Sequence, residues 1–202
     1  ITDEFRQGML SARQLSDGIR QLIVEAPLPH EIVYWVNEAY QRVAGTGTIS
    51  VRSSATDEDS GAHSFAGQLS SFLYVRNATD AAHYLKLCWA SAYSERSIGY
   101  RLQNKLSLQD ISVAVIFQKM VDPTVSGVMF TCDPADANSD HYVISSVYGV
   151  GEGLVSGLLA CDTFWVDAGS GKQLRSDIAE KQFMLRQGAS GECEQRPVAA
   201  QQ

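Results

Sequence analysis

The segment from Ser50 to Gln68 carries residue types that bind phosphate groups. Arg52 ends a short β-prone run, and its planar guanidinium can hold two phosphate oxygens at once, which a lysine does less well. The loop after it offers hydroxyl and main-chain donors, and glycines that let the main chain approach a ligand: Ser53, Ser54, Thr56, Gly61 and Gly67. Composition alone favours a solvated Ser/Asp loop, and it is the order of the whole string that predicts a phosphate-binding loop.

An acidic run and a glycine run offer further chemistry. Asp57–Asp59 supplies the oxygen ligands that Mg²⁺ prefers, but capping of the loop turn is the better interpretation. The glycines of residues 148–153 are spaced G-x-G-x-G without a parallel strand-turn-helix unit around them, which argues against a dinucleotide-binding fingerprint. Glu152 is expected to cap a helix that starts near Leu154, and the alternative is an approach to a metal and phosphate group.

The composition is that of a globular protein. In a chain of 202 residues, 45% hydrophobic and 19% charged residues suffice for one or two domains with a hydrophobic core. A net charge of −7 and the lack of a Lys/Arg block argue against a nucleic-acid surface. No apolar run approaches the ~18 residues that span a bilayer, and no signal-peptide pattern opens the sequence. We therefore expect a cytoplasmic protein with no membrane or nucleic-acid partner.

The cysteines indicate neither a zinc site nor a disulfide framework. They form no C-x-x-C pair, and no histidine lies near them at ligand spacing. The four thiols are expected to be reduced and mostly buried: Cys88, Cys132, Cys161 and Cys193.

Helices are predicted on both sides of Arg52. Apolar residues at helical spacing mark two helices before it and one after it, which ends near Arg101 and is expected to be the longest. Asn77 or Thr79 can cap that long helix. The expected elements of this half are helices at 11–25, 32–43 and about 77–101, and strands at 48–52 and 69–75.

Beyond Asp110 the pattern changes to strands separated by turn-rich segments. Helices in front and strands behind predict an α+β fold, with a helical front half and a largely antiparallel sheet in the second half. Residues 189–202 are rich in Gly, Glu, Gln and Ala and are predicted to form a poorly ordered tail. The expected strands are 111–120, 127–131, 141–147 and 163–166.

Five ordered blocks resemble the nucleotide-binding domain of phosphoenolpyruvate synthases, pyruvate phosphate dikinases and rifampin phosphotransferases. Residues 51–68 are similar to the family signature V-R-S-S-A-T-x-E-D-x-x-x-x-S-F-A-G-Q, and residues 88–101 to C-W-A-S-x-(F/Y)-x-x-R-A-x-x-Y-R. Three further blocks follow at the family's approximate spacing: 113–121, 126–131 and 148–157. The resemblance implies an ATP-grasp-like fold with nucleotide between two α+β lobes, and residues 1–188 as the central part of that domain.

The resemblance also implies a set of residues that bind ATP. Arg52 corresponds to the family's phosphate-contacting arginine, and Ser71 keeps the hydroxyl donor of the usual threonine. Gln118 stands where the family has a glutamine near adenine, although by itself it fits a polar residue on a strand face. The main chain of the following residues resembles the hinge that pairs with the base edge. The implied ATP-binding residues are Arg52, Gly67, Ser71, Gln118, Met120 and Val121.

Two parts of the family's site have no counterpart in the sequence. These are the lysine of a G-G-K-type loop and a late D-I-E-W…L-Q-S-R-P segment, whose Glu, Gln and Arg bind metal and phosphate. No histidine lies in a T-S-H-type sequence such as the family's phosphohistidine domain carries. Because stabilising a transferring phosphoryl group requires several cations and a metal together, nucleotide binding without catalysis is expected of this chain, and no catalytic or metal-ligating residue is identified.

The resemblance favours the ATP-binding portion of a phosphoenolpyruvate synthase-like dikinase that uses ATP and Mg²⁺. In such a protein ATP yields AMP and phosphate, and a phosphoryl group passes through a histidine on another domain to pyruvate or a similar acceptor. The expected partners are the phosphohistidine and acceptor-binding domains of the parent protein. Alternatives are a rifampin-type antibiotic phosphotransferase domain and a non-catalytic nucleotide-binding or assembly module. An ATP-grasp carboxylate–amine ligase is not expected to carry the signature above.

Overall fold

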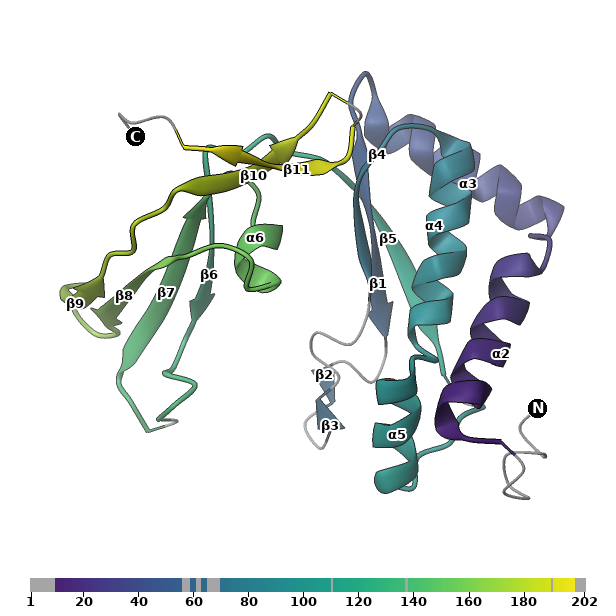
Figure 1. The fold of residues 1–202 in the computed structure, drawn as a ribbon, viewed down its shortest axis with the longest axis horizontal. Helices are drawn as coiled ribbons and strands as arrows, with labels where there is room; N and C mark the ends of the chain where they lie inside the picture. Colours follow the sequence, from purple (N-terminus) through teal and green to yellow (C-terminus); the bar gives the residue numbers. More distant parts are fainter. Residues whose placement is uncertain are drawn as a thin grey trace. The chain divides into compact units, whose positions relative to one another are not determined.

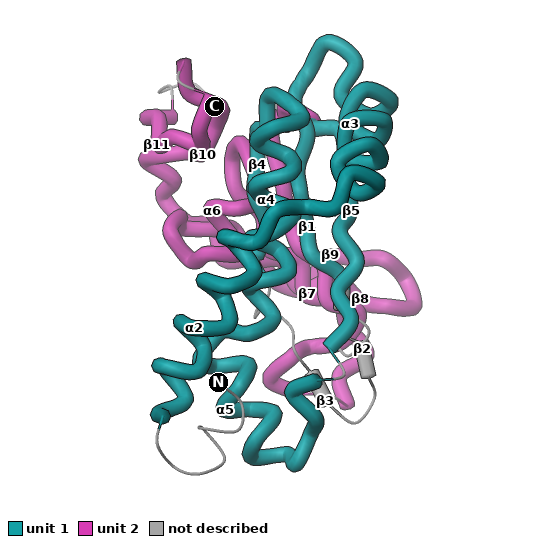
Figure 2. Tube along the Cα trace, turned by 90° about the vertical axis from the view of Figure 1, so that its right-hand side faces the viewer, with its two compact units in different colours: residues 1–120 teal, residues 121–202 magenta. Residues whose placement is uncertain are grey.

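The computed structural model describes residues 10–55, 59–60, 63–64, 70–109, 111–136, 138–189 and 191–198. The chain divides into two compact units, unit 1 (Ile1–Met120) and unit 2 (Val121–Gln202), which Figure 2 colours separately. Helices and antiparallel sheets are both present, which confirms the α+β prediction. Among the described residues, no helix has the length and apolar character needed to cross a membrane.

Three of the described helices of unit 1 begin at a residue whose side chain accepts a first-turn N–H group, whereas the helix that follows Pro29 has no side-chain cap. Ser11 and Gln14 form a capping box at the start of α2, each accepting the other's main-chain N–H. Asn77 accepts the N–H of Asp80 at 2.8 Å, which confirms one of the two predicted caps. The helices are α2 (Ala12–Glu25), α3 (His30–Ala44), α4 (Ala78–Ser91) and α5 (Glu95–Gln103).

The prediction of one long helix from about 77 to 101 is wrong. The chain leaves the helix after Ser91, and Ser94 caps α5 by accepting the N–H of Ser97 at 3.2 Å. The hydroxyl of Ser16 in α2 holds the break, because it donates to the carbonyl oxygen of Tyr93 at 2.7 Å. The sequence did not predict this break, because apolar residues continue at helical spacing from α4 into α5. At 15 residues, α3 is longer than α4 at 14.

A three-stranded antiparallel sheet forms the other layer of unit 1. Its strands are β1 (Ile49–Ala55), β4 (Ser71–Val75) and β5 (Val113–Lys119), in the order β4-β1-β5. Helices α3 and α4 cover one face (Figure 1), where alternate β1 residues point into the core. Arg52 lies on the opposite face. Buried core side chains of this unit include Val36, Tyr40, Ile49, Val51, Leu85 and Cys88.

Cys88 provides a chemical test of this packing. Its Sγ lies 3.9 Å from the carbonyl oxygen of Val51 beneath β1, and burial raises the pKa of the thiol to about 11. A rise of two units from the usual value leaves about 100-fold less reactive thiolate near pH 8. Of the four cysteines only Cys88 is buried, so the expectation of mostly buried thiols is wrong, and Cys132 is exposed.

We therefore expect a thiol reagent at pH 8 to modify Cys132 rapidly in the native protein and Cys88 only after unfolding. Mass spectrometry of the modified peptides, with and without urea, measures both rates. Equal native rates would show that α4 does not hold Cys88 against β1.

Unit 2 is an antiparallel sheet with a separate hairpin. Strands β6 (Val125–Phe130), β7 (His141–Tyr148), β8 (Asp162–Asp167) and β9 (Gln173–Asp177) lie in sequence order. The short helix α6 (Glu152–Val155) follows β7, and β10 (Phe183–Gln187) pairs with β11 (Cys193–Pro197). The described residues of the unit that are buried are Val143, Val147, Gly149, Val150, Gly153, Met184, Leu185, Gly188 and Gly191.

Two local expectations for unit 2 differ from the structure. Glu152 is the first residue of α6 rather than its cap, and the capping position is Gly151, with no side-chain hydrogen bond. Part of the predicted tail forms β11. Hydrogen bonds between Gly188 and Glu192 and between Gly191 and Gly188 close its hairpin turn, while the strand's exposed residues keep a polar composition that resembles a tail.

Candidate functional site

The sheet of unit 1 brings three of the predicted ATP-binding residues onto one face. Arg52 pairs directly with Ser71 on β4 and with Ile116 on β5. Gln118 lies two residues beyond Ile116, so it shares that face and neighbours Arg52 diagonally. A register shift between Ile49 and Val51 sets the pairing of Arg52 with Ser71. Arg52 and Gln118, which are 66 positions apart in the chain, therefore lie on adjacent strands of the sheet.

Arg52 and Gln118 are in contact. The Nη1 atom of Arg52 donates to Oε1 of Gln118 at 3.4 Å, and both side chains are exposed. The hydroxyl of Ser50 donates to the main-chain oxygen of Gln118, also at 3.4 Å. The exposed guanidinium of Arg52 therefore lies beside the exposed amide of Gln118. The main chain of Gln118 is held by hydrogen bonds to β1.

Ile116 is a candidate contact residue that sequence reasoning missed. It stands directly opposite Arg52, and 49% of its surface is exposed on a face that is otherwise polar nearby. The sequence could have indicated this residue, because alternation along a strand places Ile116 on the same face as Gln118. Only the pairing register shows that it also lies beside Arg52. An aliphatic side chain there can contact the apolar face of a sugar or base.

Ser53 plays a structural part. Its hydroxyl and its main-chain N–H both donate to the carbonyl oxygen of Ser70, at 3.0 and 3.3 Å. Both donors of Ser53 thus join the end of β1 to the start of β4, and the phosphate-binding role that the sequence suggested for it loses support.

Met120 and Val121 lie on either side of the division between the two units. The N–H of Met120 donates to the carbonyl oxygen of Thr48 at 2.9 Å, which extends the pairing of β1 with β5. A base edge that pairs with Met120 would therefore use its carbonyl oxygen, which accepts a donor such as an exocyclic amino group. Val121 has 71% of its surface exposed.

The predicted loop lies mostly outside the described residues. Gly67, Gly61, Thr56 and the first two acidic residues of the run 57–59 are among those not described. Asp59 and Ser60 form the two-residue strand β2, which pairs with β3 (His63–Ser64). The assignment of Gly67 to the phosphate site stays a prediction.

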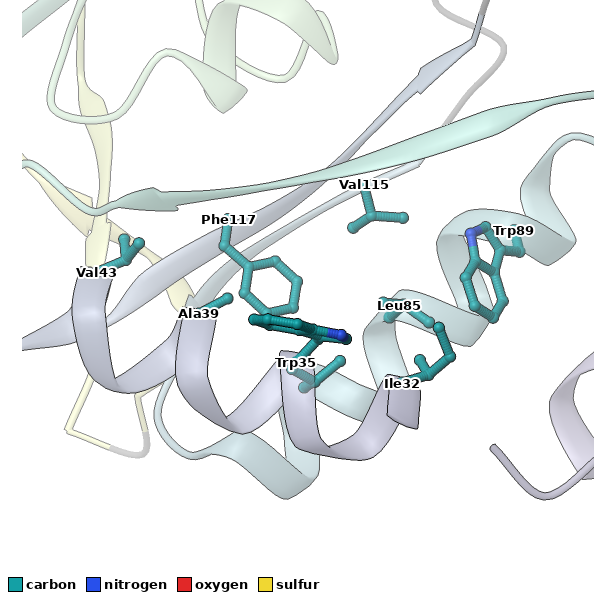
Figure 3. Close-up of a pocket in the computed structure, with 9 residues that line it drawn as sticks. Ile32, Trp35, Ala39, Val43, Leu85, Trp89, Val115 and Phe117 are labelled. Atoms are coloured by element: carbon teal, nitrogen blue, oxygen red, sulfur yellow. The ribbon is translucent and has the colours of Figure 1, made fainter. Parts of the chain in front are cut away.

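An apolar cavity of about 320 Å³ lies on the other face of the sheet. Figure 3 shows Trp35, Val115 and Phe117 turned toward it from α3 and β5. Since side chains alternate along β5, the cavity opens away from Ile116 and Gln118. It has the apolar lining of a packing defect between helices and sheet and lacks the charged donors that phosphate needs. The other lining residues are Ile32, Val36, Ala39, Val43, Leu85 and Trp89.

In unit 2 the glycine run after β7 is a packing element. Gly149 has φ +74°, and its carbonyl oxygen accepts the hydroxyl of Ser126 at 2.7 Å. The next N–H, that of Val150, donates to the carbonyl oxygen of Leu185 at 2.8 Å and ties this segment to β10. A Cβ atom on Gly149 would stand 2.1 Å from that same carbonyl oxygen, so only glycine fits.

The ionisable pairs of unit 2 hold its loops. The pKa of Asp133 is lowered, mainly by a hydrogen bond from the N–H of Ala135. Burial opposes this change, and the Nε2 atom of His141, 3.3 Å from Oδ2 of Asp133, adds to the lowering. Lys181 pairs with Asp162 at 2.5 Å, with 10% and 16% of the two side chains exposed. Both pairs join residues next to strand ends, as structural ion pairs do. Within the described ranges, no group of three or more His, Cys, Asp or Glu could hold a metal ion.

Comparison with known proteins gives the relatives of the chain. A probable phosphoenolpyruvate synthase of Methanothermobacter thermautotrophicus is 38% identical over 178 residues, covering 86% of this chain and 26% of that protein. A rifampicin phosphotransferase of Bacillus cereus is 34% identical over 189 residues, covering 94% and 22%. A prodigiosin synthesizing transferase of Serratia marcescens, PigC, is 35% identical over 174 residues, covering 86% and 19%.

The chain thus spans about a fifth to a quarter of the length of these relatives. The family described as pyruvate phosphate dikinase, AMP/ATP-binding domain, matches residues 3–202. Because that match covers nearly the whole sequence, the chain belongs to the pyruvate phosphate dikinase AMP/ATP-binding domain family.

Proposed function

We propose that the chain binds ATP on the face of the β4-β1-β5 sheet that α3 and α4 leave uncovered. The observation that carries this proposal is the convergence of Arg52, Ser71 and Gln118 on that face. The guanidinium of Arg52 supplies charge-assisted donors for phosphate oxygens, and the hydroxyl of Ser71 adds a neutral donor. Gln118 reads the base, with Ile116 as an apolar surface between base and phosphates.

The base edge would meet the chain where unit 1 passes into unit 2. The carbonyl oxygen of Met120 is the acceptor for the exocyclic amino group, and the exposed side chain of Val121 packs beside the ring. Gly67 would lie over the phosphates. An ATP-grasp-like fold, with residues 1–188 as the central part of the domain, belongs to the same proposal.

Mg²⁺ accompanies ATP in dikinases of the kind proposed, and protein sites usually bind it through one or two carboxylates together with phosphate oxygens and water. The described residues hold no cluster of three or more His, Cys, Asp or Glu side chains. The side chains of Asp57–Asp59 belong to the part of the chain that is not described. We propose that the phosphates of the nucleotide carry the Mg²⁺ ion.

For the parent protein we propose a phosphoenolpyruvate synthase-like dikinase acting in the cytoplasm. This chain would hold ATP, and other domains would carry the phosphohistidine and the acceptor. The relative named probable phosphoenolpyruvate synthase supports this reading. The relative named rifampicin phosphotransferase supports the second candidate, transfer to an antibiotic acceptor. The acceptor-binding domain of the parent protein decides between them, because both candidates use the same nucleotide site.

Calorimetric titration of the chain with Mg-ATP tests nucleotide binding directly. We expect weak, saturable binding by the 202-residue chain. A chain that is folded by circular dichroism and does not bind would overturn the ATP-binding proposal for this chain and leave the assembly-module alternative.

Replacing Gln118 by alanine is expected to weaken ATP binding about three- to tenfold, the worth of one neutral hydrogen bond. GTP binding should fall less, because guanine presents a different pattern of donors and acceptors. Titrations with both nucleotides measure the two losses. An equal loss for ATP and GTP would show that Gln118 does not read the base.

A further inference from the structure

The contact between Arg52 and Gln118 determines which way the amide group of Gln118 is oriented. A guanidinium group has five N–H donors and no acceptor. The atom of Gln118 that faces it at 3.4 Å is therefore the amide oxygen, Oε1. The amino group of the same amide must then point away from Arg52. The distance is longer than that of a strong hydrogen bond, so the contact supplies orientation rather than much binding energy.

The rest of residue 118 is held independently of this contact. Its main chain pairs with Ser50 across the strands, and the hydroxyl of Ser50 donates to its carbonyl oxygen. The side chain is exposed, so packing does not decide which end of the amide faces the ligand. Among the described residues, Arg52 is the group whose hydrogen bond to this amide sets its orientation.

The orientation of the amide determines which base it accepts. On its pairing edge adenine presents an acceptor at N1, whereas guanine presents a donor, N1–H. An amino group held toward that edge can donate to adenine and meets a second donor in guanine. An amide that is free to rotate by 180° can offer its oxygen instead and satisfy guanine equally well.

We propose that Arg52 is a positioning residue for Gln118 and that it imposes a preference for adenine over guanine nucleotides. The inference rests on the proposed ATP site and adds a task for Arg52 beyond holding phosphate. The contact uses a donor on Nη1, and with five donors the guanidinium can hold a phosphate oxygen at the same time. The end of the site that binds the phosphates would thus control the end that reads the base.

The test is the ratio of ATP to GTP affinity in single and double variants, because both nucleotides carry the same triphosphate. Loss of a phosphate contact alone weakens both nucleotides by the same factor and leaves the ratio unchanged. We expect Arg52→Ala to reduce the ratio severalfold and by less than about tenfold, as Gln118→Ala does, and the double variant to reduce it no further. Arg52→Lys keeps the positive charge, so its binding stays measurable, but a compact ammonium cannot serve both amide and phosphate as a fork does.

Four outcomes are informative. A reduced ratio in Arg52→Lys and Arg52→Ala, with unchanged selectivity in the exposed-arginine control Arg42→Ala on α3, supports the inference. A wild-type ratio in either Arg52 variant overturns it while ATP binding itself stands. Equal affinity of the wild-type chain for ATP and GTP also overturns it. If the folded wild-type chain binds neither nucleotide, the proposed function fails first, and the inference fails with it.

Discussion

Replacing Arg52 by alanine is expected to weaken Mg-ATP binding about 10- to 100-fold, the largest loss of affinity for any single substitution in the site. The guanidinium is the one cation that the β4-β1-β5 pairing places beside both Ser71 and Gln118 among the described residues. A charge-assisted hydrogen bond contributes about 1.5 to 3 kcal/mol, and the substitution removes at least one. Calorimetric titration at fixed, low salt measures the change, since screening weakens exposed charge interactions.

The control for this prediction is Arg42→Ala, which removes the same charge from the helix-covered side of unit 1. Its affinity should match the wild type. Protection of Cys88 from thiol reagents reports that the sheet and α4 are still packed in each variant, because its Sγ lies against β1. Wild-type affinity in a folded Arg52→Ala chain would remove Arg52 from the site.

Replacing Gly149 by alanine is expected to destabilise unit 2 by about 2 to 5 kcal/mol. The left-handed backbone, with φ +74°, costs a residue with a Cβ about 1 to 2 kcal/mol, and the added atom would meet the Leu185 carbonyl oxygen at 2.1 Å. That oxygen cannot move freely because it accepts the N–H of Val150. Urea-induced unfolding followed by the fluorescence of Trp165 in β8 measures the loss, in chains whose other two tryptophans, Trp35 and Trp89 of unit 1, are replaced by phenylalanine.

A matched control separates the two causes. Gly157 has nearly the same backbone angle, φ +69°, but a Cβ added there meets nothing within 4 Å. Gly157→Ala should therefore cost only the conformational part, about 1 to 2 kcal/mol. If the two variants lose the same stability, the contact between the glycine run and β10 does not constrain Gly149.

The sequence predicted the order and type of most elements of the fold. Apolar spacing and capping residues located α2, α3 and the start of α4, and alternating strands located β5 to β8. The same reasoning failed where a single local hydrogen bond decided the outcome. The Ser94 cap ends the helix although apolar residues continue at helical spacing on both sides of it. Strand β11 consists mostly of exposed polar residues, and its order depends on pairing with β10. Strand β9 was missed for a related reason, since all five of its residues are exposed.

For the site, residue types were readable from the sequence: Arg52, Ser71 and Gln118 have donors suited to phosphates and a base, and the blocks around Arg52 and Gln118 carry the family resemblance. Only the tertiary structure decided that these residues share one sheet face, because strand pairing joins positions whose separation in the chain says nothing about distance. It also decided the contact of Arg52 with Gln118 and the exposure of Ile116 beside them. Residue type is a local property, whereas register is fixed by the packing of the core on the opposite face.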